Sequence, residues 1–169
     1  RAGPRKALRA LLGPSLRTLY PMKEEIERAL NEALGVLLEK DAHILRADAN
    51  ERTISHRLAG YLEPYFDGWN VDCEYNRNHD DPKRLEIPRR NVRNDDTQAR
   101  TVFPDIIVHK RDTDENLLVI EMKKTTSQET DDFDLHKLDA FKKQLGYKFA
   151  VFVKVRTNAV PAIEAINWV

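Results

Sequence analysis

The sequence predicts an α/β fold, a three-layer α/β/α sandwich whose central mixed sheet lies between helices. Segments with the apolar periodicity of helices alternate with segments rich in β-branched and aromatic residues. From Asn50 onward these segments follow the order helix, three strands, helix, strand, helix. A strand that returns to the sheet after a helix requires a crossover connection, so we expect a mixed sheet with helices on its faces.

Four helices are predicted along the chain. The second begins after Asn50, whose side chain is a favourable N-cap, the third spans 132–145, and a closing helix is expected at 160–168. The first spans 23–40, where apolar residues recur at i, i+3, i+4 and i+7: Ile26, Ala29, Leu30, Ala33, Leu34, Leu37 and Leu38.

Turn-forming residues at 112–116 join two predicted strands into a hairpin. Residues 78–100 contain two prolines and six basic residues but no periodic pattern, so we expect a long inserted loop there. The predicted strands lie near 70–77, 101–111, 117–124 and 147–155.

The composition is that of one globular domain. The 169 residues suffice for a sizeable core, and no apolar run approaches the length of a transmembrane helix. Cys73 is the single cysteine, which excludes an internal disulfide and fits a reducing, cytoplasmic setting. We expect one domain over 22–169, with its core at 50–155, and no membrane partner.

Charge is unevenly distributed, although the formal net charge is zero. Residues 1–21 carry five basic side chains and no acidic one, so the remaining residues carry a net charge of −5. This basic N-terminal extension is compatible with a phosphate-binding arm, the tail of a targeting sequence, a linker or an upstream extension. The acidic body argues against a general polyanion binder, so any contact with nucleic acid should be local or bridged by a metal ion.

Three charged residues of the predicted hairpin are placed to converge. Glu121 and Lys123 are two apart on a strand, so their side chains leave the same face. Asp105 opens the preceding strand, directly after Pro104, which has no amide to donate to the sheet. If the turn contains an odd number of residues, Asp105 falls opposite Lys123 on that face. Two carboxylates and an amine would then be neighbours.

Such an arrangement is typical of a divalent-cation site. Neighbouring half-buried carboxylates are costly unless they are neutralised, and Mg²⁺ takes carboxylate, main-chain carbonyl and water oxygens. We expect Asp105, Glu121 and the main-chain carbonyl of Met122 to bind Mg²⁺, for which Mn²⁺ can substitute. Lys123 would hold or activate a water, and Glu51, in the first turn of its helix, is a further candidate carboxylate. The expected chemistry is hydrolysis of a phosphodiester.

The motif Pro104-Asp105, fifteen residues, then Glu121-Met122-Lys123 resembles the PD-(D/E)XK signature of the restriction-endonuclease-like nucleases. The resemblance spans the segment 50–155, where the core order of that fold (helix, three strands, helix, strand) matches the order above. It implies that Asp105 and Glu121 are metal ligands and that Lys123 is the catalytic lysine. By the same resemblance, Glu51 is the helical acid found in many members.

Three basic residues are further candidates for binding nucleic acid. Lys137 lies one turn into the helix at 132–145, and we expect it on a solvated face, with a phosphate contact as the alternative. Arg89 and Arg90 belong to the basic part of the long loop. That loop fits either a contact with a DNA backbone or a disordered charged segment.

The remaining ionisable residues are expected to have structural roles. The five histidines lack metal-ligand spacing, and we expect most of them at the surface. Asp131, Asp132 and Asp134 are expected to start a helix, where acidic side chains favour the positive end of the helix dipole.

Together these features predict a Mg²⁺-dependent nuclease, with DNA endonuclease as the leading activity. The alternative is a catalytically inactive restriction-endonuclease-like module that binds nucleic acid or protein. A surface hairpin with an ordinary Glu–Lys pair is the simplest structural explanation of the motif. A homodimer and a place in a larger multidomain protein are both compatible with the sequence.

Overall fold

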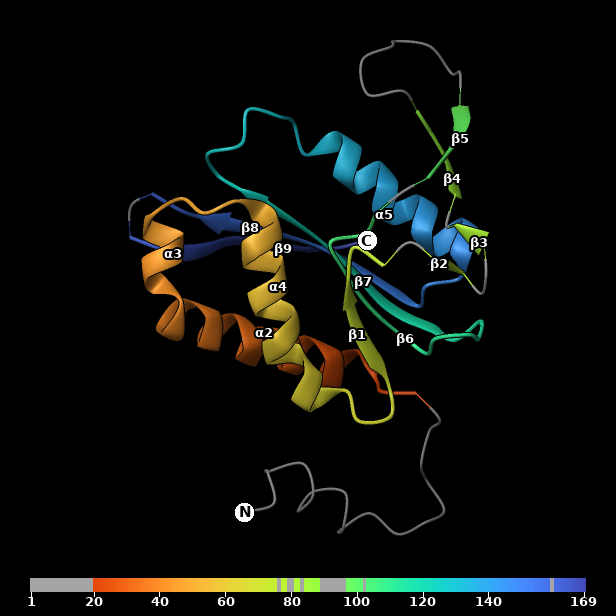
Figure 1. Ribbon diagram of the computed structural model, residues 1–169, viewed down its shortest axis with the longest axis horizontal. Coiled ribbons are helices and arrows are strands. Elements are labelled where there is room, and N and C mark those ends of the chain that lie inside the picture. The colour runs from red at the N-terminus through yellow and green to blue at the C-terminus, as the bar shows by residue number, and fades with distance from the viewer. Residues whose placement is uncertain are drawn as a thin grey trace, which may run out of the picture.

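The computed structural model describes residues 20–75, 77–78, 81–82, 84–88, 97–101, 103–158 and 160–169. Most of the predicted N-terminal extension, as well as Arg89 and Arg90, lies outside the described residues. Within them a five-stranded mixed sheet carries helices on both faces, which confirms the α/β class (Figure 1). None of the described helices is long and apolar enough to cross a membrane.

The helices of the N-terminal half form where the apolar periodicity predicts them. Helix α2 (Lys23–Lys40) buries six of its apolar side chains. Helix α4 (Glu51–Leu62) begins at the predicted N-cap, because the side chain of Asn50 accepts a hydrogen bond from the third helical amide at 2.8 Å. A short helix α3 (Ala42–Arg46) lies between them, and a 3-10 turn η2 (Glu63–Tyr65) follows α4.

The sheet has the strand order β1-β6-β7-β8-β9. Within it only β7 and β8 run parallel, and helix α5 (Asp132–Leu145) forms the crossover between them. The predicted mixed sheet and crossover are thus confirmed, with β7 as the central strand. The strands are β1 (Asn70–Cys73), β6 (Ile106–His109), β7 (Asn116–Lys124), β8 (Phe149–Arg156) and β9 (Ala162–Trp168).

The side chains of β7 alternate between two cores. Ile120 and Met122 pack in the core under α2 and α4. Val119 packs in a second core with residues of α5. Helix α5 covers the face of the sheet opposite α2 and α4 (Figure 1). Since Glu121 and Lys123 share the parity of Val119, their side chains leave β7 on the side of α5.

The predicted closing helix at 160–168 is wrong, because this segment is strand β9, paired antiparallel with β8. Ile163 and Ile166 are three residues apart, a spacing that indicates a helix in the sequence. In the structure a register shift between Lys154 and Val155 lets both isoleucines pack on the same core. Pairing with β9 also satisfies the backbone groups along the outer edge of β8.

The prediction of a long loop at 78–100 is also wrong for the residues that the structure describes. They form two short antiparallel pairs, β2 (Arg77–Asn78) with β3 (Asp81–Pro82) and β4 (Arg84–Pro88) with β5 (Thr97–Thr101). Leu85 of β4 is buried in the α5 core. The side chain of Gln144 on α5 binds both the amide and the carbonyl of Glu86, each at 2.9 Å. Contacts with α5 therefore hold this hairpin.

The strand predicted at 101–111 is likewise shorter than expected. Residue 101 ends β5, whereas β6 begins only at Ile106. Pro104 cannot donate a backbone hydrogen bond, so a regular ladder cannot include it on both sides. The break releases Asp105 from the strand and leaves its carboxylate free to bind elsewhere.

The N-cap of α4 supports both stability and the placement of Glu51. Asn50→Ala should lower the free energy of unfolding by about 1 kcal/mol, because the capped amide loses its acceptor. Asn50→Asp keeps an acceptor of similar size and should stay close to the wild type. Urea unfolding followed by circular dichroism measures both. Equal stability of Asn50→Ala and the wild type would show that this cap contributes nothing.

Candidate functional site

Asp105 lies immediately before β6 and beside the centre of β7. The ladder pairs Ile106 with Ile120, so the next step of the same register sets Asp105 opposite Glu121. The predicted position opposite Lys123 is wrong, because β6 and β7 pair in a different register, which also shifts at an irregularity between Val108 and His109. The parity is unchanged, so the three charged residues still share the face toward α5.

The side chain of Asp105 is hydrogen-bonded to the backbone of β7. Its Oδ2 accepts a hydrogen bond from the amide of Met122 at 2.7 Å, so Met122 enters the site through its N–H. Burial raises the pKa of Asp105 above its ordinary value, although the charge of Lys137 opposes the rise. The carboxylates of Glu51 and Asp134 raise it further. The Asp105 carboxylate is thus fixed in place among other charges.

The two carboxyl oxygens of Glu121 have different surroundings. The residue is only 2% exposed. Its Oε2 accepts a hydrogen bond from the Nζ of Lys137 at 2.8 Å, whereas its Oε1 is buried without a hydrogen-bond partner. Burial raises the pKa of Glu121 to about 8, against the opposing charge of Lys137. Because a buried oxygen without a donor is costly, Oε1 is an atom that a proton or a cation would stabilise.

Lys137 reaches Glu121 from α5, so its expected place on a solvated face is wrong. The side chain is 11% exposed, and its Nζ also donates to the carbonyl of Phe103 at 2.8 Å. Burial by itself would lower the pKa of Lys137, but the charges of Glu121 and Asp105 outweigh burial and raise the pKa. Lys137 lies one turn before the buried Phe141, on the stripe of α5 that faces the sheet.

Lys123 is 4% exposed and is paired with the first turns of α5. Its Nζ donates to the carbonyl of Thr130 at 2.7 Å and to Oδ2 of Asp134 at 2.5 Å. Helix α5 begins at the acidic residues where the sequence predicts it, but the sequence did not assign Asp134 to the site. The i, i+3 spacing of Asp134 and Lys137 is the signal that indicates one shared helix face.

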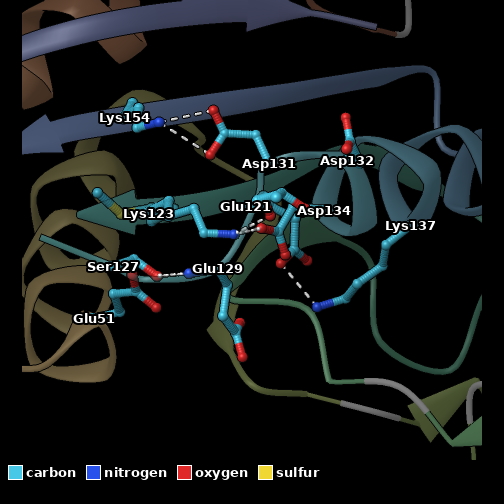
Figure 2. A network of polar contacts seen from close by, with 12 residues as sticks. Glu51, Glu121, Lys123, Ser127, Glu129, Asp131, Asp132, Asp134, Lys137 and Lys154 are labelled. Atoms are coloured by element: carbon cyan, nitrogen blue, oxygen red, sulfur yellow. Dashed lines mark hydrogen bonds and ion pairs between the residues drawn. The ribbon is translucent and has the colours of Figure 1, made fainter. Parts of the chain in front are cut away.

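Two pairs of opposite charge therefore connect β7 with α5: Lys123 with Asp134, and Glu121 with Lys137 (Figure 2). Glu121 and Lys123 are two residues apart on β7, so they share one face of the strand. Asp134 and Lys137 are three residues apart on α5, so they share one face of the helix, and both pairs join these two faces. In both pairs at least one partner is almost fully buried. The candidate site therefore consists of charged side chains that lie between the sheet and α5.

Glu51 stands at the end of β7, where its Oε1 accepts a hydrogen bond from the amide of Lys124 at 2.9 Å. The preceding loop is held by Asp48, whose Oδ1 accepts from the hydroxyl of Thr157 at 2.6 Å and from that of Thr126 at 2.9 Å. Hydrogen bonds from Thr157 foremost, then from Lys124 and Thr126, lower the pKa of Asp48 to about 2. The first turn of α4 is thereby fastened to the end of the central strand.

Most histidines lie at the surface as expected, since His43, His56 and His136 are exposed. His109 differs, because it is 3% exposed and its Nε2 lies 2.9 Å from Oδ2 of Asp72. This pair links β6 to β1 and so has a role in the sheet itself.

The described residues contain no group of three or more His, Cys, Asp or Glu side chains arranged to hold a metal ion. Mg²⁺ binds through one or two carboxylates and keeps several waters, so Asp105 and Glu121 fit it in kind. If all groups of the cluster are ionised, two negative charges remain, which a divalent cation would neutralise. The cluster holds four carboxylates and two ammonium groups, those of Glu51, Asp105, Glu121, Asp134, Lys123 and Lys137. The ligand role of the Met122 carbonyl stays a prediction.

The raised pKa of Glu121 predicts how stability depends on pH. The value rises from 4.5 to about 8 in the folded protein, so the folded protein binds this proton more tightly than the unfolded chain. The stabilising contribution is complete below the unfolded value and is lost as the pH rises through the folded value. In EDTA, the melting temperature of Glu121→Gln should therefore rise relative to that of the wild type between about pH 5.5 and about pH 8.5.

Glu24→Gln, at an exposed position of α2, is the matched control and should show no such trend. A difference between Glu121→Gln and the wild type that stays constant across this range would contradict the raised pKa.

Comparison of the chain with protein-family models, with curated proteins and with solved structures found no match. We therefore infer a function from the chemistry of the side chains that the fold brings together.

Proposed function

We propose that this protein is a metal-dependent nuclease of the PD-(D/E)XK, restriction-endonuclease-like kind, which hydrolyses phosphodiester bonds of DNA. The observation that carries the proposal is that Asp105 lies opposite Glu121, whose Oε1 is buried without a partner and whose Oε2 accepts a hydrogen bond from Lys137. The order of elements from α4 through β1, β6, β7, α5 and β8 agrees with the core that the resemblance implies. The pairs β2–β3 and β4–β5 are then insertions in that core.

In this proposal Asp105, Glu121 and the carbonyl of Met122 hold Mg²⁺, and Mn²⁺ can take its place. When bound, the cation would counter the charge that develops on the phosphoryl oxygens and lower the pKa of a water. Glu121 would bind the cation as a carboxylate, so binding would release the proton that its raised pKa retains. Asp105 is already oriented by the amide of Met122.

The two lysines have separate parts in the proposed reaction. Asp134 and the carbonyl of Thr130 position Lys123, whose ammonium group counters negative charge in the transition state. Lys137 lies on the same face and is a candidate contact for a phosphate. A contact of this kind is local, which suits a chain whose body is acidic. The roles of Arg89 and Arg90 in binding DNA, a cytoplasmic location and a homodimeric or multidomain assembly stay predictions.

A catalytically inactive module that binds nucleic acid or protein is the second candidate. The observation that favours it is the hydrogen bond from Lys137 to Glu121, since an ammonium group can neutralise this acid without a metal ion. Such a module would bind DNA equally well in Mg²⁺ and in EDTA, and would cleave it in neither.

Incubation with plasmid, single-stranded DNA or RNA, each in Mg²⁺, Mn²⁺ or EDTA, separates these candidates. We expect cleavage of DNA with either metal ion and none in EDTA. Asp105→Ala and Glu121→Ala should abolish both cleavage and metal binding, because each removes a proposed ligand. Asp139→Ala, at an exposed acid of α5, should cleave like the wild type. Cleavage in EDTA, or undiminished cleavage by Asp105→Ala, would sink the proposal.

Lys123→Ala tests the proposed catalytic lysine. Single-turnover cleavage should slow by roughly 10²-fold or more, because a fixed cation beside the phosphate is lost. Affinity for DNA, measured by fluorescence anisotropy in Ca²⁺, should change much less than the rate. Lys143→Ala, on the exposed side of α5, is the control. A wild-type rate for Lys123→Ala would mean that Lys123 is only a structural partner of Asp134.

A further inference from the structure

Lys137 is placed where it must affect the binding of any cation to Glu121. Its ammonium group lies 2.8 Å from Oε2 of Glu121 and 2.8 Å from the carbonyl oxygen of Phe103. The other oxygen of Glu121, Oε1, is buried without a hydrogen-bond partner, so a positive charge lies beside only one of the two oxygens. Figure 2 shows the side chain of Lys137 reaching back from α5 toward Glu121.

A lysine side chain is suited to be a temporary counter-ion of a carboxylate. Its ammonium is a compact charge on a flexible four-carbon stem, so it can leave a carboxylate by rotation of single bonds. The side chain of Lys137 is 11% exposed against 3% for Glu121, so the lysine is the member of the pair nearer to solvent. Mg²⁺ binds a carboxylate oxygen at about 2.0–2.1 Å and would repel an ammonium group held on the same carboxylate.

We propose that Lys137 is an internal counter-ion that competes with the divalent cation for Glu121, so that metal binding displaces its ammonium group. The proposal rests on the proposed function, since the cation is the one assigned to Asp105 and Glu121. Lys137 thereby sets the metal concentration at which the site fills. The displaced ammonium group stays on the face of Asp105, where it can bind a phosphate oxygen of the substrate.

The competing explanation is that Glu121 and Lys137 form a permanent buried pair. In that case removal of the lysine leaves an uncompensated buried carboxylate but does not free a metal site. The two explanations differ in the affinity for a metal ion, which is measured independently of catalysis.

The test is a calorimetric titration of the purified full chain with Mn²⁺ near pH 8, without nucleic acid. Lys137→Met removes the charge and keeps the length of the side chain, so Mn²⁺ should bind at least about tenfold more tightly. Lys137→Arg keeps the charge and Lys143→Met removes an exposed charge of the same helix, so both should stay near the wild type. Adding Glu121→Gln to Lys137→Met should abolish the gain, which assigns it to this carboxylate.

Circular dichroism and thermal melting establish that each variant is folded, and Lys137→Gln, which retains a donor, replaces Lys137→Met if the latter does not fold. Tighter binding by the uncharged variant supports the proposal, including the case in which the wild type binds no Mn²⁺ and the variant does. Unchanged or weaker binding overturns it. If Mn²⁺ binds equally to both and DNA is cleaved, only the competition fails. If the variant binds more tightly but neither protein cleaves DNA, only the proposed nuclease function fails.

Discussion

The structure depends on the burial of charged side chains in the centre of its sheet. Eight of the nine residues of β7 are buried, and Glu121 and Lys123 are among them. An unpaired charge in such surroundings costs several kcal/mol, so both residues must find partners within the fold. Asp134 and Lys137 supply the opposite charges from one face of α5. The helix is therefore placed on the sheet by charge pairing as well as by the packing of its apolar residues.

The central strand also fixes the helix on the opposite face. Lys124, the last residue of β7, donates its amide to Glu51 at 2.9 Å and its Nζ to the carbonyl of Asp48 at 3.1 Å. The start of α4 is thus tied to the strand end that follows Glu121 and Lys123. Acidic groups from the segment before β6, from β7, from α4 and from α5 consequently gather around one strand. Such rigidity is what a site needs in order to hold charged groups at fixed positions.

The burial of several acidic groups close together lowers the stability of the fold. Because its pKa is about 8, the Glu121 carboxyl group is fully charged, as its pairing with Lys137 requires, only above that pH, and its Oε1 still lacks a partner. Strongly shifted pKa values and unpaired buried polar atoms cluster at functional sites, which is why the proposed function is centred on Glu121. A proton, an ammonium group or a metal ion can each neutralise Glu121, and in our proposal the metal ion has to displace the other two.

The sequence alone determined the elements whose stability is local. Apolar periodicity placed α2, α4 and α5, the N-cap side chain of Asn50 began α4, and strand parity put Glu121 and Lys123 on one face. Tertiary structure decided what depends on distant partners. Strand β9 exists because the edge of β8 needs pairing, and the β4–β5 hairpin is held by α5. The charge pairs made by Asp134 and Lys137 likewise form only when α5 packs on the sheet. A buried charge pairs with an opposite charge that is close in space, and the spacing of residues along the chain does not give that proximity.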